Sequence, residues 1–420
     1  MKAAATGMDG ETLFLCHRIP FPPDRGDKIR SWHLLEAAAK LAPVHVGCFA
    51  DDDRDMSFAA EMERVAASQC VLMRDRSRAV AGLSGLIRRQ PMLVALYDKP
   101  GMRRWVARLL RERPIRTIIC YSVQMAHFLP GKLPANVRFL MDFVDFDSAK
   151  YAAYGAAQGG PMGWINRREG RLLHDYEKKV AHRADISLFV SAAEADMFRR
   201  AGGVEGCRID ALDNGVNLDY FHVDGGYPAI GRPGGGPLIV FTGQMDYRPN
   251  IEAVESFATG ALPAIRRRHP EACFAIVGRN PVPQVEALGA LPGVVVTGGV
   301  PDVRGWLAAA DVVVAPLRIA RGIQNKVLEA MAMARPVVAS PQAAEGIDAR
   351  EGEHLLIAPD VAGEAEAVLS LLADPARAAA LGGAARRRVE ERYDWASTLA
   401  PLRAMLAGGG GKGSREAEAA

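Results

Sequence analysis

A lysine and a glutamate stand three residues apart in the segment 311–340, at Lys326 and Glu329. The segment reads as a buried strand, a loop ending at Gly322 and a helix, and residues at this spacing share one face of a helix. The positive N-terminal end of a helix, together with the Lys326 ammonium, suits a diphosphate. Glu329 can accept hydrogen bonds from the vicinal hydroxyls of a ribose. The alternative is a surface ion pair between the two side chains.

A second candidate site is the loop after the first predicted strand, within HRIPFPPDRGDKIRSWH at 17–33. A strand, a proline-containing loop and a helix opening near Asp27 present backbone N–H groups that can hold an anion or a sugar oxygen. Gly26 would let a ligand approach the backbone, and Lys28 and Arg30 add positive charge. Ligands of parallel α/β sheets bind beyond the carboxyl ends of strands, so this position favours a functional loop over a plain turn. The Gly-x-Gly-x-x-Gly fingerprint does not follow any predicted strand, which argues against a dehydrogenase.

Short apolar runs alternate with helix-period segments along most of the chain and would position these loops. Continuous apolar runs suit strands that are buried on both faces, as in a parallel sheet. Helices are predicted at 29–41 and 251–258, with Asn250 capping the second. The alternation predicts the α/β class with doubly wound parallel sheets. The predicted strands are 11–16, 44–49, 69–73, 117–121, 137–143, 186–190, 238–242, 273–277, 294–297, 312–315, 336–339 and 355–358.

The two halves of this pattern are separated by residues 222–237, which are rich in glycine and proline and lack periodicity. Such a segment is predicted to be a linker. We therefore expect two Rossmann-like domains, at 1–221 and 238–389. The glycine-rich end of the chain, 407–420, is predicted to be a disordered tail.

Charge is unevenly distributed. The 420 residues include 52 basic and 49 acidic ones, and the formal net charge of +3 gives no global field that would attract nucleic acid. The segment 74–116 alone holds 12 basic and three acidic residues, with Leu, Ile, Met and Trp between the arginines. This pattern suits a helix on an anionic membrane surface. It equally suits a solvated helix face opposite a buried one. No nucleic-acid-binding module accompanies the patch.

Cysteine and histidine usage points to a cytoplasmic protein without a metal site. The six cysteines have no close pairing, which predicts reduced thiols in place of a disulfide framework. The histidines lack ligand spacing. No run approaches the ~20 apolar residues that span a bilayer, and the N-terminus lacks the features of a secretory signal.

The motifs together resemble a known family. LEAMAMARPVVAS, FTGQMDYRPNIEAV and DNGVNLDYF are similar to motifs of the GT-B-fold retaining glycosyltransferases of family 4. The resemblance is closer to the sugar transferases associated with the PEP-CTERM/exosortase exopolysaccharide system, and it runs from Leu13 to Leu406. It implies two Rossmann-like domains that face a cleft, with a C-terminal helix at 390–406, carrying Tyr393 and Trp395, that packs back on the first domain. The segments that carry the closer resemblance are HRIPFPPDRGDKIRSWH, MDFVDFDSAKY, FVSAAEADMF, IVGRNP, RIARGIQNKVLEAMAMARPVVAS and AAEGID.

The resemblance also implies roles for individual residues. Glu329 matches the second glutamate of the family's Glu, seven residues, Glu signature, which holds the nucleotide ribose. The first glutamate is replaced by Arg321, and Gln244 stands where the family usually has arginine. Asp145 lies near the position of a His or Asp that faces the reacting centre, and its alternative role is a helix cap. The expected catalytic residues are Asp145, Arg321 and Lys326. The expected donor-binding residues are Gly26, Asp27, Gly243, Arg248, Gly322, Gln324, Asn325, Lys326 and Glu329.

The implied activity is transfer of a sugar from a nucleotide-sugar donor to a glycan or lipid-linked acceptor, with retention and without a bound metal or other cofactor. Backbone dipoles, Lys and Arg would stabilise the leaving diphosphate. The expected location is the cytoplasm, with peripheral contact at the cytoplasmic face of the inner membrane and no nucleic-acid partner. Two alternatives remain at this point, a nucleotide-sugar epimerase of the same fold and a non-catalytic scaffold of an exopolysaccharide assembly complex.

Overall fold

The computed structural model describes residues 9–23, 25–75, 85, 89–228, 230–320 and 322–407. The chain divides into two compact units. Unit 1 comprises Met1–Leu212 with Leu399–Ala420, and unit 2 comprises Asp213–Thr398.

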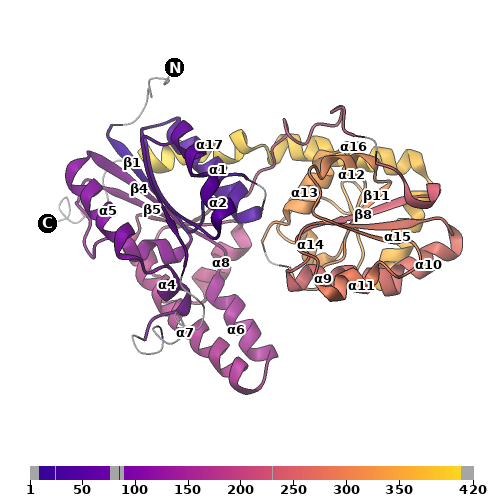
Figure 1. Ribbon diagram of the computed structural model, residues 1–420, viewed down its shortest axis with the longest axis horizontal. Coiled ribbons are helices and arrows are strands. Elements are labelled where there is room, and N and C mark those ends of the chain that lie inside the picture. Colours follow the sequence, from indigo (N-terminus) through magenta and orange to yellow (C-terminus); the bar gives the residue numbers. More distant parts are fainter. Residues whose placement is uncertain are drawn as a thin grey trace. The chain divides into compact units, whose positions relative to one another are not determined.

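Unit 1 is built on a seven-stranded parallel sheet in the order β3-β2-β1-β4-β5-β6-β7. The inner strands are apolar and buried along most of their length, as their sequences predict, because helices flank the sheet (Figure 1). The strands are β1 (Glu11–Cys16), β2 (Val44–Ala50), β3 (Ser68–Met73), β4 (Ile115–Tyr121), β5 (Arg138–Val144), β6 (Ile186–Phe189) and β7 (Ile209–Ala211). The helices are α1 (Gly26–Ala39), α2 (Asp53–Ser57), α4 (Met92–Tyr97), α5 (Pro100–Glu112), α6 (Asp147–Ala157), α7 (Gly160–Arg183) and α8 (Ala192–Arg200), with 3₁₀ turns at Ala59–Arg64 and Val123–Phe128.

Unit 2 is built on a six-stranded parallel sheet in the order β10-β9-β8-β11-β12-β13. The strands are β8 (Leu238–Thr242), β9 (Cys273–Val277), β10 (Val294–Gly298), β11 (Val312–Ala315), β12 (Val337–Ala339) and β13 (Leu356–Ile357). The helices are α9 (Arg248–Ser256), α10 (Leu262–Arg268), α11 (Pro283–Leu288), α12 (Arg304–Ala309), α13 (Asn325–Ala332), α14 (Pro341–Ala344), α15 (Val361–Ala373) and α16 (Pro375–Arg392), with a π-helical turn at Phe257–Ala261 and a 3₁₀ turn at Pro233–Gly235. A last helix, α17 (Trp395–Ala407), begins in unit 2 and ends in unit 1.

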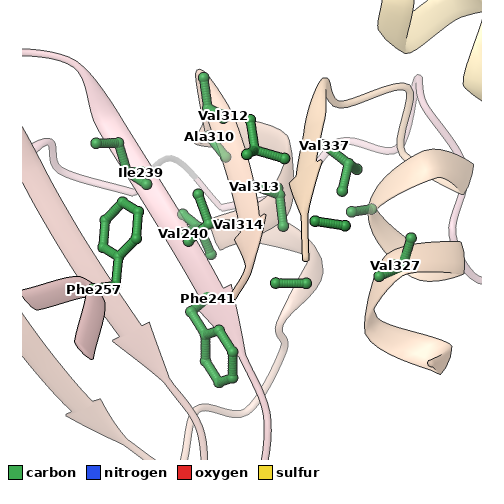
Figure 2. Close-up of a cluster of buried hydrophobic side chains, with 14 of the residues drawn as sticks. Ile239, Val240, Phe241, Phe257, Ala310, Val312, Val313, Val314, Val327 and Val337 are labelled. Carbon is green, nitrogen blue, oxygen red and sulfur yellow. The ribbon is translucent and has the colours of Figure 1, made fainter. Parts of the chain in front are cut away.

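The core of unit 2 lies around the two central strands. Figure 2 shows side chains of β8, including Ile239 and Phe241, beside those of β11, with Val327 of α13 directed toward the same cluster. Burying one such side chain contributes ~1.5–3 kcal/mol. The packing therefore fixes α13 against the carboxyl half of the sheet.

The doubly wound α/β architecture predicted from the sequence is confirmed, and most predicted strands appear within a residue or two of their expected bounds. Strand β7 was not predicted, because three residues are too few to produce a hydrophobic pattern. In each sheet the strand order reverses beside one strand, β1 in unit 1 and β8 in unit 2. Sites of doubly wound folds lie beyond the carboxyl ends of strands at such points.

The segment predicted as a linker, 222–237, is part of unit 2, which begins at Asp213. Side-chain contacts tie it there. The Arg304 guanidinium lies 3.8 Å from the ring centre of Tyr220 and 5.0 Å from that of Tyr227, and Arg232 donates to Asp311. The division of the structure therefore falls earlier than the predicted boundary at residue 221.

The C-terminal region also differs in detail from the predicted single helix at 390–406. Helix α16 ends at Arg392 and α17 begins at Trp395. Between them Tyr393 is buried, its carbonyl oxygen accepts a hydrogen bond from Val216 N, and its hydroxyl accepts one from Asp348 N at 2.5 Å. These bonds explain the break. The predicted tail lies, from residue 408 onward, outside the described residues.

Candidate active site

The amino group of Lys326 lies at the carboxyl edge of the unit 2 sheet. Its Nζ donates to Asn250 Oδ1 at 2.6 Å and sits 4.2 Å from the ring centre of Phe241, on β8. Gly243 follows β8, and a Cβ atom built there would lie 3.2 Å from the same Nζ. The Lys326 amino group is therefore held by an amide oxygen and an aromatic ring, and neither of these carries a negative charge. An anionic ligand can still be attracted to it.

Asn250, which was predicted to cap the helix, has a different role. Helix α9 begins three residues earlier than expected, at Arg248, because Pro249 suits the first turn of a helix. Asn250 therefore lies within the first turn. Its Nδ2 donates to the Gln244 carbonyl at 2.8 Å, and its Oδ1 accepts the hydrogen bond from Lys326 Nζ. The sequence analysis named this residue only as a cap and missed its contact with Lys326, for which an asparagine shortly after the strand was the available signal.

Burial moves the pKa values of Lys326 and Glu329 toward each other. Desolvation lowers the pKa of Lys326 to about 7, against a smaller opposite effect of Glu329. Desolvation raises the pKa of Glu329 to about 7, against the attraction of Lys326. Neither side chain is at its ordinary charge at neutral pH, and perturbed pairs of this kind are concentrated at functional sites. The structure records no ion pair between these two described residues, so the simple surface-pair alternative is wrong.

The start of α13 contributes backbone and amide groups. Gly322 has a φ of 64°, a left-handed conformation that glycine adopts without strain. Gln324 precedes the helix, and its Nε2 donates to the Gly322 carbonyl at 3.2 Å. Asn325 Oδ1 accepts from Asn214 Nδ2 at 3.4 Å. Arg321, expected to be catalytic, lies outside the described residues.

Arg248, expected to bind the donor, is the first residue of α9 and pairs along its own helix. Its Nε donates to Glu252 Oε1 at 2.7 Å, one turn further along α9, and the side chain is exposed. Gly243 is better placed, because the chain is tightly packed around it. A Cβ atom on Gly278 would lie 1.6 Å from the Gly243 carbonyl oxygen. The loops after β8 and β9 therefore approach each other at backbone distance.

In unit 1 the loop after β1 is held by an ion-pair cluster centred on Asp27. Its carboxylate contacts Arg18 at 2.5 Å, Arg25 at 2.7 Å and His17 at 3.4 Å. Burial alone would raise the pKa of Asp27, but His17 and the two arginines hold it far below its usual range. Gly26 is the first residue of α1 and is exposed. Asp27 thus fixes the loop that carries Gly26.

The positive charges predicted for this loop at Lys28 and Arg30 are neutralised inside unit 1. Lys28 Nζ pairs with Asp55 at 2.6 Å. Arg30 is buried, with Nε 3.0 Å from Asp142 Oδ2 and Nη1 donating to the Leu212 carbonyl at 2.7 Å. The prediction that they offer charge to a ligand is wrong, because each has a carboxylate of its own.

Two buried aromatic groups offer hydrogen-bonding atoms at the carboxyl ends of β1 and β4. The rings of His17 and Tyr121 are stacked, with centres 5.8 Å apart and planes 7° apart. His17 Nδ1 and Tyr121 Oη are buried without a hydrogen-bond partner among the described residues. Buried polar atoms in proteins are usually paired, so these two atoms are exceptions at this edge of the sheet.

Asp145 follows β5 and is paired with a lysine. Lys150 Nζ lies 2.6 Å from Asp145 Oδ2 and 3.1 Å from Asp147 Oδ1. The preceding residue, Val144, has a φ of 71°, which a β-branched side chain rarely adopts. The helix-cap alternative for Asp145 is wrong, because α6 begins after Phe146 and has no side-chain cap.

Two buried glutamates that the sequence analysis missed hold the turn around Asp145. Glu194 accepts from Phe146 N at 2.7 Å, and Glu177 accepts from Ser148 N at 3.1 Å and from Ser148 Oγ at 2.5 Å. Burial raises the pKa of Glu177 to about 8 despite its bonds to Ser148. The turn is therefore fixed from α7 and α8.

The basic segment 74–116 is partly outside the described residues, which omit 76–84 and 86–88. In the described part, helix α5 buries Met102, Trp105, Val106 and Leu109 in the core of unit 1. Its basic residues face outward. No described helix has the length and apolar composition needed to cross a bilayer. The described residues also contain no cluster of His, Cys, Asp or Glu suited to a metal, and metal independence remains a prediction.

Comparisons with known proteins identify the class. Residues 236–374 match the family described as Glycosyl transferases group 1. The chain is 32% identical over 273 residues to a GDP-mannose-dependent alpha-(1-6)-phosphatidylinositol monomannoside mannosyltransferase of Mycolicibacterium smegmatis, which covers 60% of this chain and 69% of that enzyme. It is 28% identical over 268 residues to a glycogen synthase of Mycobacterium tuberculosis, covering 61% of this chain and 62% of that enzyme.

Solved structures show the same architecture. Sucrose-phosphate synthase from Thermosynechococcus elongatus superposes with a TM-score of 0.64 at 19% identity, covering 93% of this chain and 97% of that one. WaaG, a glycosyltransferase involved in lipopolysaccharide biosynthesis, gives 0.65 at 16% identity, covering 95% and 100%. Anabaena HepE in complex with UDP-glucose gives 0.63 at 15% identity, covering 94% and 99%.

The fold is therefore GT-B, and the protein is a glycosyltransferase. The chain belongs to the group 1 glycosyltransferases. This membership favours a transferase over the epimerase and the scaffold that the sequence left open.

Proposed function

We propose that the chain transfers a hexosyl group from a nucleotide-sugar donor to a glycan or lipid-linked acceptor, with retention of anomeric configuration. The observation that carries the proposal is the Lys326 ammonium at the carboxyl edge of the unit 2 sheet, bonded to an amide oxygen instead of a carboxylate. A cation held in this way can stabilise the charge that develops on a leaving diphosphate. The GDP-mannose-dependent relative and the UDP-glucose complex of HepE support a donor of this class.

On the donor side, each residue has a distinct task. Lys326 and the N-terminal N–H groups of α13, with Gln324 and Asn325, receive the diphosphate. Gly243 and Gly322 let the backbone approach it. Glu329 accepts hydrogen bonds from the ribose hydroxyls, and Arg321 adds charge near the sugar.

On the acceptor side, unit 1 offers the polar groups at the ends of β1, β4 and β5. His17, whose side chain is partly exposed, binds an acceptor hydroxyl. Asp145 orients the acceptor, and Asp27 keeps Gly26 in place. We do not assign Arg248 to either side, because its guanidinium pairs with Glu252 of the same helix.

The proposed reaction needs no nucleophile from the enzyme. The bond between the sugar C1 and the diphosphate oxygen breaks as the acceptor oxygen bonds to C1 from the same face, and the acceptor proton passes to the diphosphate. Lys326 and the helix end supply the positive charge in place of a metal. Neutralisation of the leaving group is the main contribution of the protein to this step.

The biological setting is proposed from the resemblance and the relatives. The PEP-CTERM/exosortase-like motifs favour exopolysaccharide synthesis. The relatives named as mannosyltransferases of phosphatidylinositol monomannoside and of phosphatidyl-myo-inositol favour a lipid-linked acceptor. Such an acceptor would place the chain at the cytoplasmic face of the inner membrane. The outward-facing basic residues of 74–116 are consistent with contact to anionic lipid.

Thermal unfolding with a series of nucleoside diphosphates tests the proposal. A ligand at ~100 times its dissociation constant adds about 2.7 kcal/mol, which corresponds to about 5–10 °C for units of this size. We expect stabilisation by at least one of GDP, UDP and TDP, and transfer from the matching sugar donor with retention, read by NMR of the product anomer. Absence of stabilisation by all three, or an inverted product, would contradict it.

A further inference from the structure

Helices α6 and α7 form a hairpin whose tip is uncharged. Figure 1 shows the hairpin extending away from the sheet of unit 1. Residues 151–166, which make its tip, read YAAYGAAQGGPMGWIN and contain no charged side chain. A solvent-exposed turn usually carries charge, so this composition needs a physical reason.

Large apolar side chains are exposed on the tip. Met162 is 58% exposed and Trp164 54%, and Tyr154 and Ile165 are also exposed. These are four of the eight large hydrophobic residues that are exposed in the described part of the chain. Exposed apolar residues gathered in one place mark interaction sites, whereas scattered ones need no explanation.

The two helices are tightly packed against each other at the tip. A Cβ atom on Gly163 would lie 1.9 Å from the Gln158 carbonyl oxygen, and one on Gly155 would lie 2.7 Å from Arg167 Cγ. Arg167 Nη1 donates to the Gly155 carbonyl at 2.7 Å, and Asn166 donates to Gln158 at 3.0 Å. The interior of the hairpin has no room for the aromatic and aliphatic side chains, so they point outward.

Basic residues border the apolar tip. Arg167 follows Trp164 by three residues, is exposed, and donates to a backbone carbonyl, that of Gly155. Arg168 is largely buried and paired with Glu169, and its Nη2 donates to the carbonyl of Gly85, inside the basic segment 74–116. Glu169, next to it, accepts from Met92 N at 2.6 Å. The hairpin is therefore joined to the basic segment at Gly85 and Met92, and Arg89, which lies between these two residues in the sequence, is exposed.

We propose that the tip of the α6–α7 hairpin inserts into the interfacial region of a bilayer with anionic lipid headgroups. Trp, Tyr, Ile and Met without charge are the side chains that enter this region, and the bordering arginines bind the headgroups. A second copy of the chain is a poorer occupant, because it would bring like-charged arginines together. This inference rests on the proposed function, because it assumes a lipid-linked acceptor. It assigns the membrane contact to residues of the α6–α7 tip, which lie outside the basic segment 74–116.

Vesicle binding tests the proposal. Co-sedimentation would compare phosphatidylcholine vesicles with and without phosphatidylglycerol, using wild type, a Met162→Ser/Trp164→Ser/Ile165→Ser variant, and Val223→Ser as a matched exposed apolar control in unit 2. We expect binding to the anionic vesicles, weakened about tenfold or more by the triple change and unaltered by the control. Equal binding by wild type and the triple variant would overturn the proposal.

Fluorescence quenching gives an independent result on the native chain. Bromine-labelled lipids should quench part of the tryptophan emission of wild type, and Trp164→Phe should remove that quenching. Equal quenching in wild type and Trp164→Phe would contradict insertion. Insertion would also be contradicted if the wild type self-associates and never binds vesicles, and the triple change makes it monomeric. Nucleoside diphosphate stabilisation measured on the same variants separates the two proposals. Stabilisation without vesicle binding would refute only the membrane contact, and vesicle binding without stabilisation would refute only the proposed donor.

Discussion

One cation at the carboxyl edge of the unit 2 sheet, Lys326, is held differently from the basic side chains at the same edge of the unit 1 sheet, whereas Arg318, after β11, pairs with Glu364 as they do with their carboxylates. In unit 1 the cations Arg18, Lys28, Arg30 and Lys150 each have a carboxylate of their own within 3.0 Å. In unit 2 the bonded partner of Lys326 is the neutral amide of Asn250. The two edges look similar in sequence, since both combine glycine with lysine and arginine after a strand.

This difference distinguishes basic side chains that stabilise the fold from a basic side chain that can bind a ligand. A cation paired with a buried carboxylate stabilises its loop and has little attraction left for a ligand. A cation held by an amide against an aromatic ring keeps its charge available, and burial penalises that charge until an anion arrives. The lowered pKa of Lys326 is the result expected for a cation that is buried without a carboxylate partner.

The largest expected effect comes from breaking the buried pair in unit 1. Arg30→Ala should lower the free energy of unfolding by about 3–5 kcal/mol, because it leaves Asp142 buried without its partner. Denaturant unfolding would measure it. The matched control is Arg111→Ala, whose exposed pair with Glu112 should be worth less than ~1 kcal/mol. Equal losses for the two variants would remove the structural role of Arg30.

The next effect concerns the ribose contact of unit 2. Glu329→Ala should weaken nucleoside and nucleoside diphosphate binding alike, by roughly 1.5–3 kcal/mol, because it removes hydrogen bonds to a charged acceptor. Calorimetric titration would measure both ligands. Glu366→Ala, an exposed change on α15, is the control. Unchanged affinities in folded Glu329→Ala would exclude the residue from the site.

The pH dependence of ligand binding tests the proposed role of the Lys326 charge. Because the pKa of Lys326 in the free protein is lowered to about 7, its ammonium is lost as pH rises through that value. The affinity for a nucleotide sugar, relative to its nucleoside, should therefore fall about tenfold between roughly pH 6 and 8. Glu329 affects both ligands and cancels from the ratio. A ratio that stays flat over this range would mean that Lys326 does not contact the diphosphate.

The smallest expected effect is on stability. Lys326→Met keeps the side-chain volume and removes a charge that burial disfavours, so unfolding should change by less than ~1 kcal/mol. Denaturant unfolding beside Arg30→Ala makes the comparison direct. A loss as large as that of Arg30→Ala would show that the two cations have the same structural role.

Most of the fold could be predicted because hydrophobic patterning determines it. Buried parallel strands such as β8 and β11 are continuous apolar runs, and these are visible in one sequence. The boundary between the units could not be predicted in the same way. Tyr220 and Tyr227 pack around Arg304, which is distant in sequence, and no local pattern shows that contact.

The candidate site was only partly visible for the same reason. The spacing of Lys326 and Glu329 places them on one helix face, which is a local property. Whether a cation is paired depends on residues far along the chain, such as Asp142 for Arg30 or Asn250 for Lys326. Residue type alone therefore overstated the role of Lys28 and Arg30 and missed the contact of Asn250 with Lys326.

The most direct test of the central claim is calorimetric binding of a nucleoside diphosphate and of its nucleoside to wild type and Lys326→Met. The account predicts that the diphosphate affinity falls about tenfold or more while the nucleoside affinity stays within about twofold, because the ammonium acts only where phosphate charge is present. Equal losses for both ligands, or no loss for either, would contradict the claim that Lys326 holds the diphosphate.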